Sequence, residues 1–356
     1  MPDFNNMIPR YDTREQIEVV RFQEPKPSMF RTSFFTGADV YSPTETIEWD
    51  EVRDGASMAR YVNEFDGEVE ATEREPFTTH EITSPRVQEK RVLGVRELVK
   101  RLPGENVYST KTPAQRAQEF LDGDYAFCMD SIDRRVEQQC AQMMVSGRVD
   151  IIGKGVNNYV DYNLPLKLAL SGTDRWGQAG VNPFDTLQMM SQTLRKRNYN
   201  PTMVMMELSV AQIFIQNFEI WKTWLDIRNA ETGQVAPGPV TNIFDAAQYF
   251  GRINWPGIGQ LDLYTYDGTY KDENGAVIPY LDEGRILMLS AEAMQNRLLY
   301  GAVTIINENE SFETIEGRYV PEFFVDRRAR THTVLMTSRP LPVPFMSDSW
   351  WTARVL

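Results

Sequence analysis

The chain has 356 residues, a hydrophobic content of 42% and a formal net charge of −13. Its length exceeds the usual size of a single hydrophobic core and favours about two domains. The acidic balance argues against a general nucleic-acid-binding protein, because such proteins need a basic face to neutralise phosphates. The same charge is also explained as a surface that keeps a folded protein from associating nonspecifically.

Only two cysteines occur, Cys128 and Cys140, and both fall on one predicted helix. Along a helix they stand about 18 Å apart, which is beyond the reach of a disulfide. We therefore expect free thiols, as in proteins of a reducing cytoplasm. No apolar run approaches the roughly 20 residues that span a membrane. Residues 1–6 also lack the basic and apolar regions of a signal peptide.

Residues 1–48 are rich in proline and show no sustained periodicity, yet they are too apolar for a solvated tail. We expect an arm that lies on the body of the chain or on a neighbouring copy. The prolines are Pro2, Pro9, Pro25, Pro27 and Pro43, and the apolar side chains include Phe30, Phe34, Phe35, Val40 and Tyr41.

Residues 56–92 alternate between apolar and charged side chains, which is typical of a two-stranded hairpin with polar faces. The predicted tip is Glu73-Arg74-Glu75-Pro76. An isolated hairpin of this length is marginally stable in water, so we expect it to rest on another surface. A charged surface hairpin without a partner is the alternative.

The clearest predicted element is a helix over residues 113–146. Thr112 is placed as its N-cap, Pro113 as its first helical residue and Gln115 as the residue that completes a capping box. Apolar residues recur every three or four positions, and Gly147 supplies the stop. Gly123 weakens the helix near its start, so we expect any bend at that residue.

The rest of the chain predicts a mixture of helices and strands. The expected helices cover residues 183–197 and 209–225, followed by a loop over 226–242. The sequence Asp272-Glu273-Asn274-Gly275 predicts a turn that joins strands 261–266 and 276–281 in a hairpin. Further strands are expected at residues 149–152, 159–162, 203–206, 302–306, 322–325, 331–337 and 350–356.

Residue spacing gives no constellation for catalysis or metal binding. His80 and His332 have no cysteine or carboxylate at metal-ligand spacing. Cys128 lies on the apolar stripe of the long helix, where a buried and unreactive thiol is the common case. The cluster Arg327-Arg328-Ala329-Arg330 is too short for a nucleic-acid patch, and we expect it to pair with acidic groups on a neighbouring chain. A structural or binding role is favoured, with an unrecognised two-domain enzyme as an alternative.

The order of these elements resembles the capsid protein E family of lambda-like tailed phages, which has the Hong Kong 97-type capsid fold. The resemblance spans nearly the whole chain and depends on an ordered series of short matches. These are Phe34-Phe35 and Val40-Tyr41 for the arm, Gly67-Glu68-Val69 and Phe77-Thr78 for the extended loop, Thr112-Pro113-Ala114 for the start of the spine helix, Gly268-Thr269-Tyr270, Asn274-Gly275, Ile278-Pro279 and Leu281-Asp282 for the axial hairpin, and Tyr300-Gly301, Arg318-Tyr319-Val320-Pro321, Phe323 and Arg330 for the C-terminal third.

The resemblance implies an α+β fold with an N-terminal arm, an extended β-hairpin loop, a peripheral domain that contains the spine helix, and an axial α/β domain. The implied bounds are 1–48 for the arm, 49–95 for the extended loop, 96–180 and 302–338 for the peripheral domain with its spine helix at 113–146, and 181–301 and 339–356 for the axial domain.

The resemblance also implies a major capsid protein that has no catalytic site, metal or cofactor and self-assembles into pentamers and hexamers. The resulting icosahedral head shell would form in the host bacterial cytoplasm, enclose double-stranded DNA nonspecifically and expand during maturation. A separate scaffolding protein, a portal protein and, as is common in the lambda-like group, a decoration (cement) protein are the implied partners, with no membrane. An encapsulin-type nanocompartment shell, which shares the fold, is the alternative.

Contacts between copies are expected at the arm, the extended loop and the basic cluster, and Gly123 is the candidate hinge of the spine helix. The expected contact residues are Phe34, Phe35, Tyr41, Phe65, Glu73, Arg74, Glu75, Phe77, Arg327, Arg328 and Arg330.

Overall fold

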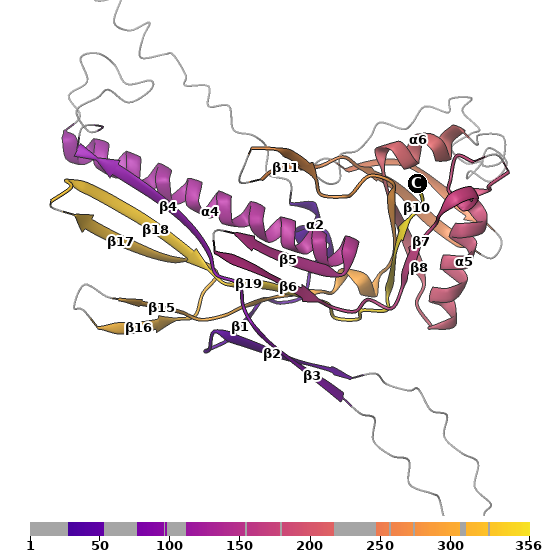
Figure 1. The fold of residues 1–356 in the computed structure, drawn as a ribbon, viewed down its shortest axis with the longest axis horizontal. Helices are drawn as coiled ribbons and strands as arrows, with labels where there is room; N and C mark the ends of the chain where they lie inside the picture. Colours follow the sequence, from indigo (N-terminus) through magenta and orange to yellow (C-terminus); the bar gives the residue numbers. More distant parts are fainter. Residues whose placement is uncertain are drawn as a thin grey trace, which may run out of the picture.

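A long helix runs along one half of the molecule, and a mixed sheet flanked by two helices forms the other half (Figure 1). In the following, these halves are called the peripheral half and the axial half. The computed structural model describes residues 28–52, 77–95, 97, 112–153, 155–178, 180–216, 247–255, 258–272, 275–306, 311–326 and 328–356.

The long helix α4 (Pro113–Ser146) has the bounds that the sequence predicts. Its capping box is complete: the Thr112 hydroxyl accepts from the Gln115 N–H at 3.3 Å, and Gln115 Oε1 accepts from the Thr112 N–H at 2.9 Å. Gly147 ends the helix with φ +69°, the left-handed conformation that glycine adopts without strain. The helix continues through Gly123, so in this structure that residue lies within an unbroken helix.

Helix α4 covers a three-stranded antiparallel sheet, in the order β17 (Val320–Asp326), β18 (Thr331–Ser338) and β4 (Val87–Gly94). The predicted strands 322–325 and 331–337 are thereby confirmed. The alternation in residues 87–92 was interpreted as one limb of a charged hairpin, and this is wrong. Burial alternates from residue to residue along β4, because one of its faces packs on α4 while the other faces outward, as in any half-buried strand.

The hairpin that the structure describes consists of β2 (Thr46–Val52) and β3 (Phe77–Thr83), paired antiparallel. Its limbs therefore begin earlier in the chain than residue 56. The predicted tip, Glu73-Arg74-Glu75-Pro76, lies outside the described residues. The described base does not stand free: Ile47 is buried, and Trp49 packs on the hydrophobic core with its ring 6.2 Å from that of Tyr162.

The axial half is built on a six-stranded mixed sheet. Helices α5 (Pro183–Lys196) and α6 (Leu208–Gln216) pack on one of its faces, and α5 begins at Asn182, whose side chain accepts from the Phe184 N–H at 3.2 Å. The remainder of the second predicted helix lies outside the described residues. In sheet order the strands are β7 (Lys167–Ala169), β20 (Trp350–Arg354), β13 (Arg285–Ser290), β8 (Pro201–Glu207), β10 (Gly259–Tyr266) and β9 (Ala247–Trp255).

The predicted pairing of residues 261–266 with 276–281 is wrong. Strand β10 lies between β8 and β9 in the large sheet, and its last four residues are buried, as suits an interior strand. The predicted turn at 272–275 instead joins two short strands, β11 (Thr269–Lys271) and β12 (Val277–Pro279). The turn was predicted correctly because it depends on neighbouring residues, whereas the choice of partner strand depends on residues far away in the sequence.

Alternating side chains of the large sheet belong to two hydrophobic cores. On β8, Met203 and Met205 face the core that includes α4, and Val204 and Met206 face the core of α5 and α6. One sheet therefore serves as the wall of both cores, and the two halves share it.

Three smaller sheets complete the fold. The segment that carries α2 (Met29–Phe34) lies on α4 and leads into the first of these sheets. The strands are β1 (Val40–Tyr41), β14 (Arg297–Tyr300) and β19 (Pro340–Val343) in the first sheet, β5 (Arg148–Gly153) and β6 (Val156–Asp161) in the second, and β15 (Val303–Ile306) and β16 (Phe312–Ile315) in the third.

Two glycines of the long helix should respond oppositely to alanine. Gly123→Ala is expected to raise the free energy of unfolding by up to about 1 kcal/mol, because a Cβ there meets no atom within 4 Å and the helical backbone loses conformational freedom. Gly147→Ala is expected to lower it by about 1 kcal/mol or more, because φ is +69° and a Cβ would lie 2.6 Å from Leu164 Cγ. Chemical denaturation of both variants beside the parent protein measures the two shifts. Equal effects would contradict the assignment of Gly147 as the helix stop.

Candidate assembly surface

Strand β17 forms the outer edge of the peripheral sheet and exposes apolar side chains on both of its faces. Phe323, Phe324 and Val325 are 40%, 43% and 52% exposed, and successive residues of a strand point to opposite sides. Helix α4 packs on β4 and β18, so β17 lies beyond its cover (Figure 1). A continuous apolar run is typical of a strand buried on both faces, and an exposed apolar edge invites pairing with another chain.

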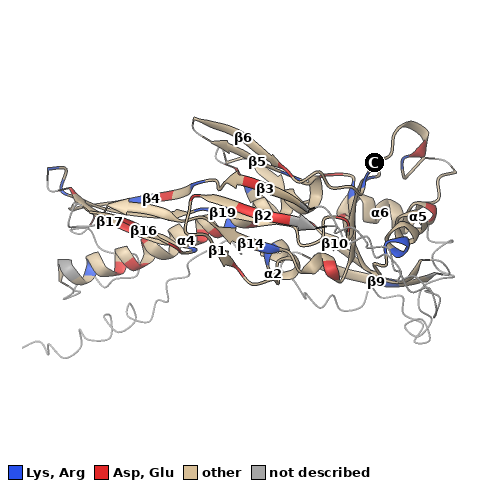
Figure 2. Cartoon of the chain, turned by 90° about the horizontal axis from the view of Figure 1, so that it is seen from below, with Lys and Arg blue, Asp and Glu red and all other residues tan. Residues whose placement is uncertain are grey.

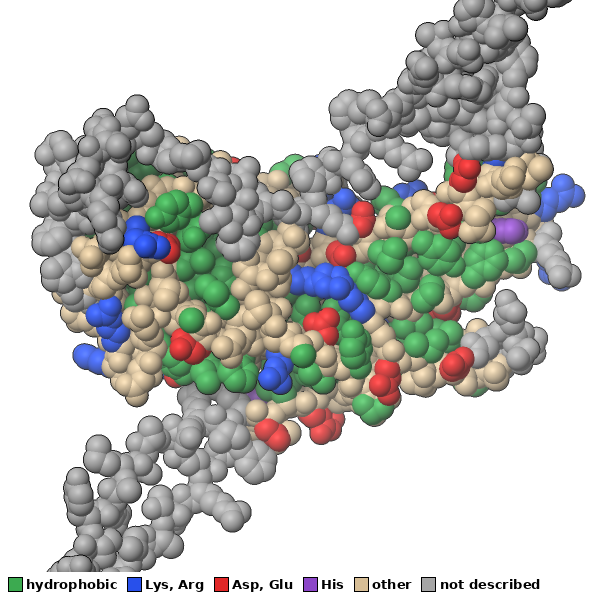
Figure 3. Space-filling model, turned by 180° about the vertical axis from the view of Figure 1, so that it is seen from behind, with side chains coloured by type: hydrophobic (Ala, Val, Ile, Leu, Met, Phe, Trp, Pro, Cys, Tyr) green, Lys and Arg blue, Asp and Glu red, His purple; other side chains and the backbone are tan. Residues whose placement is uncertain are grey.

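The β15–β16 hairpin is a second exposed apolar element. Ile306 and Phe312 are cross-strand partners at its outer end, with exposed fractions of 57% and 79%. A two-stranded hairpin with so little buried area is marginal by itself in water. Figure 3 shows hydrophobic side chains gathered over the peripheral half on the side facing away from the view of Figure 1.

A basic turn joins β17 to β18. The Asp326 carboxylate accepts from the backbone N–H groups of Arg328 at 2.8 Å and Ala329 at 3.0 Å, which fixes the turn, and Arg330 follows with φ +54°. The side chains of Arg328 and Arg330 are exposed and form no ion pair with the described residues. Two guanidinium groups are thus available to an acidic partner.

The outward face of the β2–β3 hairpin has the opposite charge. Glu48 and Glu81 are direct cross-strand partners and both are exposed, with Asp50 one step further along the same face. Figure 2 shows this acidic colouring along β2. Like charges placed directly opposite each other destabilise a strand pair, so a cation from outside the hairpin would relieve the repulsion.

The predicted contact residues fall into three groups. Tyr41 is exposed, and its ring stacks on that of Tyr300 at 5.5 Å between centroids. Phe34 and Phe35 are buried in the core of their own chain, at 0% and 7% exposure, because α2 packs on α4. In this conformation they have no surface for a neighbouring copy, which departs from the expectation. Phe65, Glu73, Arg74, Glu75 and Arg327 lie outside the described residues, as does the side chain of Phe77.

Ile306, Phe312 and Phe324 were not among the contact residues predicted from the sequence. The run Phe323-Phe324-Val325 in a predicted strand of the C-terminal third was the available signal, because alternation is lost there. Phe312 had a weaker signal, being a lone aromatic in an acidic stretch.

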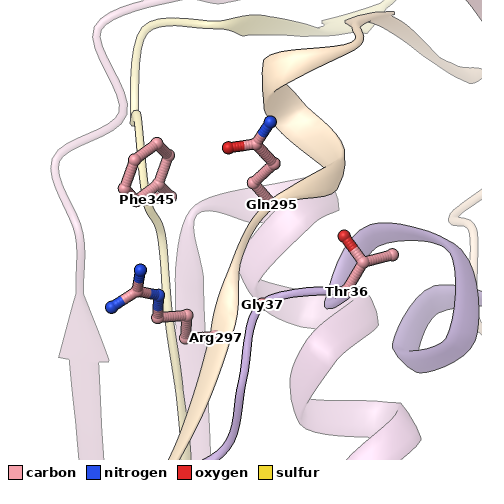
Figure 4. Close-up of a pocket in the computed structure, with 5 residues that line it drawn as sticks. All are labelled: Thr36, Gly37, Gln295, Arg297 and Phe345. Atoms are coloured by element: carbon pink, nitrogen blue, oxygen red, sulfur yellow. The ribbon is translucent and has the colours of Figure 1, made fainter.

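A shallow pocket of about 340 Å³ lies where the residues after α2 meet β14 (Figure 4). It is lined by Thr36, Gly37, Gln295, Arg297 and Phe345, and the Arg297 guanidinium is 5.5 Å from the centre of the Phe345 ring. Arg297 is the only ionisable side chain in this lining, so the pocket lacks an acid–base pair. Among the described residues no group of His, Cys, Asp and Glu side chains could hold a metal ion.

Neither cysteine is placed as a nucleophile. Both side chains are buried, and burial next to Glu89 and Asp124 raises the pKa of Cys128 to about 11. The thiol is therefore protonated near neutral pH and inert. Within the part of the chain that the structure describes, no helix is long and apolar enough to cross a membrane.

The sequence profile of the phage major capsid protein E family matches residues 12–355. The chain belongs to this family. The family consists of capsid shell proteins, and this chain is accordingly a bacteriophage capsid protein rather than a member of an enzyme family. A search of curated proteins finds no match.

Several solved structures are similar to this chain. The capsid protein of a prophage of Escherichia coli CFT073 is 17% identical with a TM-score of 0.63, and the match covers 93% of each chain. The capsid of cyanophage P-SCSP1u is 10% identical with a TM-score of 0.48, over 94% of this chain and 90% of that one. The SrpI encapsulin of Synechococcus elongatus PCC 7942 is 13% identical with a TM-score of 0.43, over 94% and 92%. The family match and the prophage capsid protein, with its TM-score of 0.63, confirm the Hong Kong 97-type fold that the sequence predicts.

Thiol accessibility checks the packing of α4 in this capsid protein. Neither Cys128 nor Cys140 should react with a thiol-specific reagent at about pH 8 while the protein is folded, because both are buried and protonated. Both should react at once after unfolding in denaturant, which serves as the control. Fast reaction in the native state would show that α4 is not packed as described.

Proposed function

We propose that this capsid protein forms pentamers and hexamers of an icosahedral head shell and that β17 and the β15–β16 hairpin contact neighbouring copies. The observation that carries the proposal is the exposure of Ile306, Phe312, Phe323, Phe324 and Val325 in a single chain. Burial of one such side chain contributes about 1.5–3 kcal/mol. Repetition over many subunits makes a closed shell stable although each contact is modest.

Charge complementarity supports a contact between the β2–β3 hairpin of one copy and the β17–β18 turn of another. Glu48 and Glu81 repel each other on the hairpin, and Arg328 and Arg330 have no anionic partner among the described residues. A contact between the two sites would reduce the repulsion between Glu48 and Glu81 and would give Arg328 and Arg330 anionic partners. The residues beyond the described base of the hairpin, including Glu73, Arg74 and Glu75, extend this proposed contact.

The same proposal covers the partners and the place of assembly. We expect assembly in the bacterial cytoplasm on a separate scaffolding protein, a portal protein at one vertex, a decoration protein on the outside, and expansion as double-stranded DNA enters. The net charge of −13 supports a container that holds DNA without binding it, because an acidic wall repels phosphates. Gly123 remains the proposed hinge of α4 during expansion.

Electron microscopy of the expressed protein, with and without the scaffolding protein of the same phage, tests the shell itself. Closed shells in the presence of scaffold are the expected result. Persistent monomers under the same conditions would contradict the proposal. Closed shells that form without scaffold and take up a cargo enzyme would favour an encapsulin-type compartment instead.

Phe312→Asp should abolish or reduce shell formation at least about tenfold, because the variant loses about 2 kcal/mol of apolar burial per contact and adds a carboxylate. The free energy of unfolding of the unassembled chain should change by less than about 0.5 kcal/mol, since the side chain is 79% exposed. Phe312→Leu is the matched control and should still assemble. Normal shells from Phe312→Asp would show that this hairpin makes no contact between copies.

Charge reversal tests the second contact. The double variant Arg328→Glu and Arg330→Glu should lower the yield of shells, whereas Arg175→Glu, at an exposed position of the axial half, should not. Adding Glu48→Arg and Glu81→Arg to the double variant should restore assembly, because the charges are exchanged. Failure of this rescue, with each variant folded, would assign the two charged sites to different contacts.

A further inference from the structure

A buried carboxylate on the long helix holds the N-terminal segment. Glu137 is 1% exposed and lies on the side of α4 that faces α2. The backbone N–H of Phe30 donates to Glu137 Oε1 at 2.7 Å, and that of Arg31 donates to Oε2 at 2.9 Å. These amides belong to the first turn of α2, where N–H groups have no acceptor within their own helix. Glu137 therefore provides hydrogen-bond acceptors for the first turn of α2, as an N-cap side chain normally does, although it belongs to another helix.

Apolar packing surrounds this attachment. Met29, Phe30 and Phe34 are at most 1% exposed. The Phe30 ring meets the rings of Phe34 and Tyr266 edge to face, at 5.6 Å and 5.4 Å between centroids. Burial of these side chains stabilises the docked segment independently of pH, and the Glu137 carboxyl adds a pH-dependent contribution.

The nearby cation is bound by a different acid. Arg31 Nη1 lies 3.3 Å from Asp133 Oδ1, one helical turn before Glu137, and Arg318 Nη2 lies 2.6 Å from the same oxygen. Tyr319 also donates to Asp133. No ion pair joins Glu137 to any described residue. The other titratable groups that interact with Glu137 or surround it are Asp39 after α2, Arg134 and Cys140 on α4, and Tyr270 and Tyr280 beside the β11–β12 hairpin.

Burial dominates the acid–base behaviour of Glu137. Desolvation raises the pKa of its carboxyl from 4.5 to about 7, although the two amide hydrogen bonds and Arg31 act in the opposite direction. A released segment would expose the carboxyl to water and return its pKa towards 4.5. The docked state thus binds the proton more tightly than the released state. By linkage, docking is strongest below about pH 4.5 and weakens as the pH rises through about 7.

We propose that Glu137 is a pH-sensitive latch that holds residues 28–36 on α4 and releases them more readily when it ionises. The latch controls when the N-terminal arm can leave the body of its own chain and reach another copy. This consequence rests on the proposed function, whereas the latch itself is a property of the single chain. It also gives a role to the buried Phe34 and Phe35, which become available for contacts only after release.

Hydrogen–deuterium exchange of the full-length protein measures the latch, because amide exchange reports rare local openings. After correction for the intrinsic exchange rate, the protection of peptides covering residues 28–36 should fall about tenfold between about pH 6 and pH 8, as follows from a pKa that changes from about 7 to 4.5 on release. Peptides from β8 and β13, in the sheet that both cores share, should show no such change. Equal protection of residues 28–36 at both pH values would overturn the proposal.

Two variants locate the effect at Glu137. Glu137→Gln cannot ionise, and the protection of residues 28–36 should become independent of pH. Asp133→Asn removes the neighbouring carboxylate but leaves Glu137 in place, so the tenfold dependence should persist. If only Asp133→Asn abolished the pH dependence, the titrating group would be Asp133 and the proposal would be overturned. If Glu137→Gln fails to fold, the parent protein and Asp133→Asn still decide the question.

Electron microscopy of the same samples separates the latch from the shell. Normal shells without pH-dependent protection of residues 28–36 would contradict the latch but not the proposed function. pH-dependent protection of residues 28–36 in a chain that never forms shells would support the latch and contradict the proposed function.

Discussion

The carbonyl groups at the end of α4 join the two halves of the molecule. The last carbonyls of any helix lack partners within the helix and must find others when they are buried. Here the Met144 carbonyl accepts from Trp350 Nε1 at 3.2 Å, and the Val145 carbonyl accepts from Thr352 Oγ1 at 2.5 Å and Arg285 Nη1 at 3.1 Å. The donors come from β20 and β13, two adjacent strands of the axial sheet. The helix that spans the peripheral half is therefore anchored directly in the sheet of the axial half.

This anchoring explains how the fold can carry exposed elements at its far end. Because the axial sheet forms a wall of both hydrophobic cores, the halves do not need a separate interface to stay in place. Part of the apolar surface that remains exposed lies on β17 and on the β15–β16 hairpin, and another part lies on the β5–β6 hairpin. The single chain thus has its own buried cores, and assembly can add further stability through the exposed elements.

Two acids on α4, the partly exposed Asp133 and the buried Glu137, hold the N-terminal segment. Asp133 and Glu137 stand one turn apart and bind the N-terminal segment by different groups, the first through the Arg31 side chain and the second through the α2 backbone. Burial raises the pKa of the Glu137 carboxyl to about 7, so its charge changes near neutral pH. The segment is thus held by an ion pair and by a second carboxyl whose charge changes near neutral pH.

Local signals in the sequence determined the bounds of α4, because a capping box at Thr112 and a glycine stop at residue 147 act within a few residues. They also determined the turn at 272–275, most strands of the C-terminal third and, through an ordered series of motifs, the capsid fold.

Only the tertiary structure decided which strands pair: residues 261–266 joined the large sheet, and residues 87–94 joined the peripheral sheet rather than a free hairpin. It alone showed that Phe34 and Phe35 are buried and that β17 is an uncovered edge. It alone placed Glu137 against the amides of a helix more than a hundred residues earlier, since hydrogen bonds and burial between distant segments leave no periodic trace in the sequence.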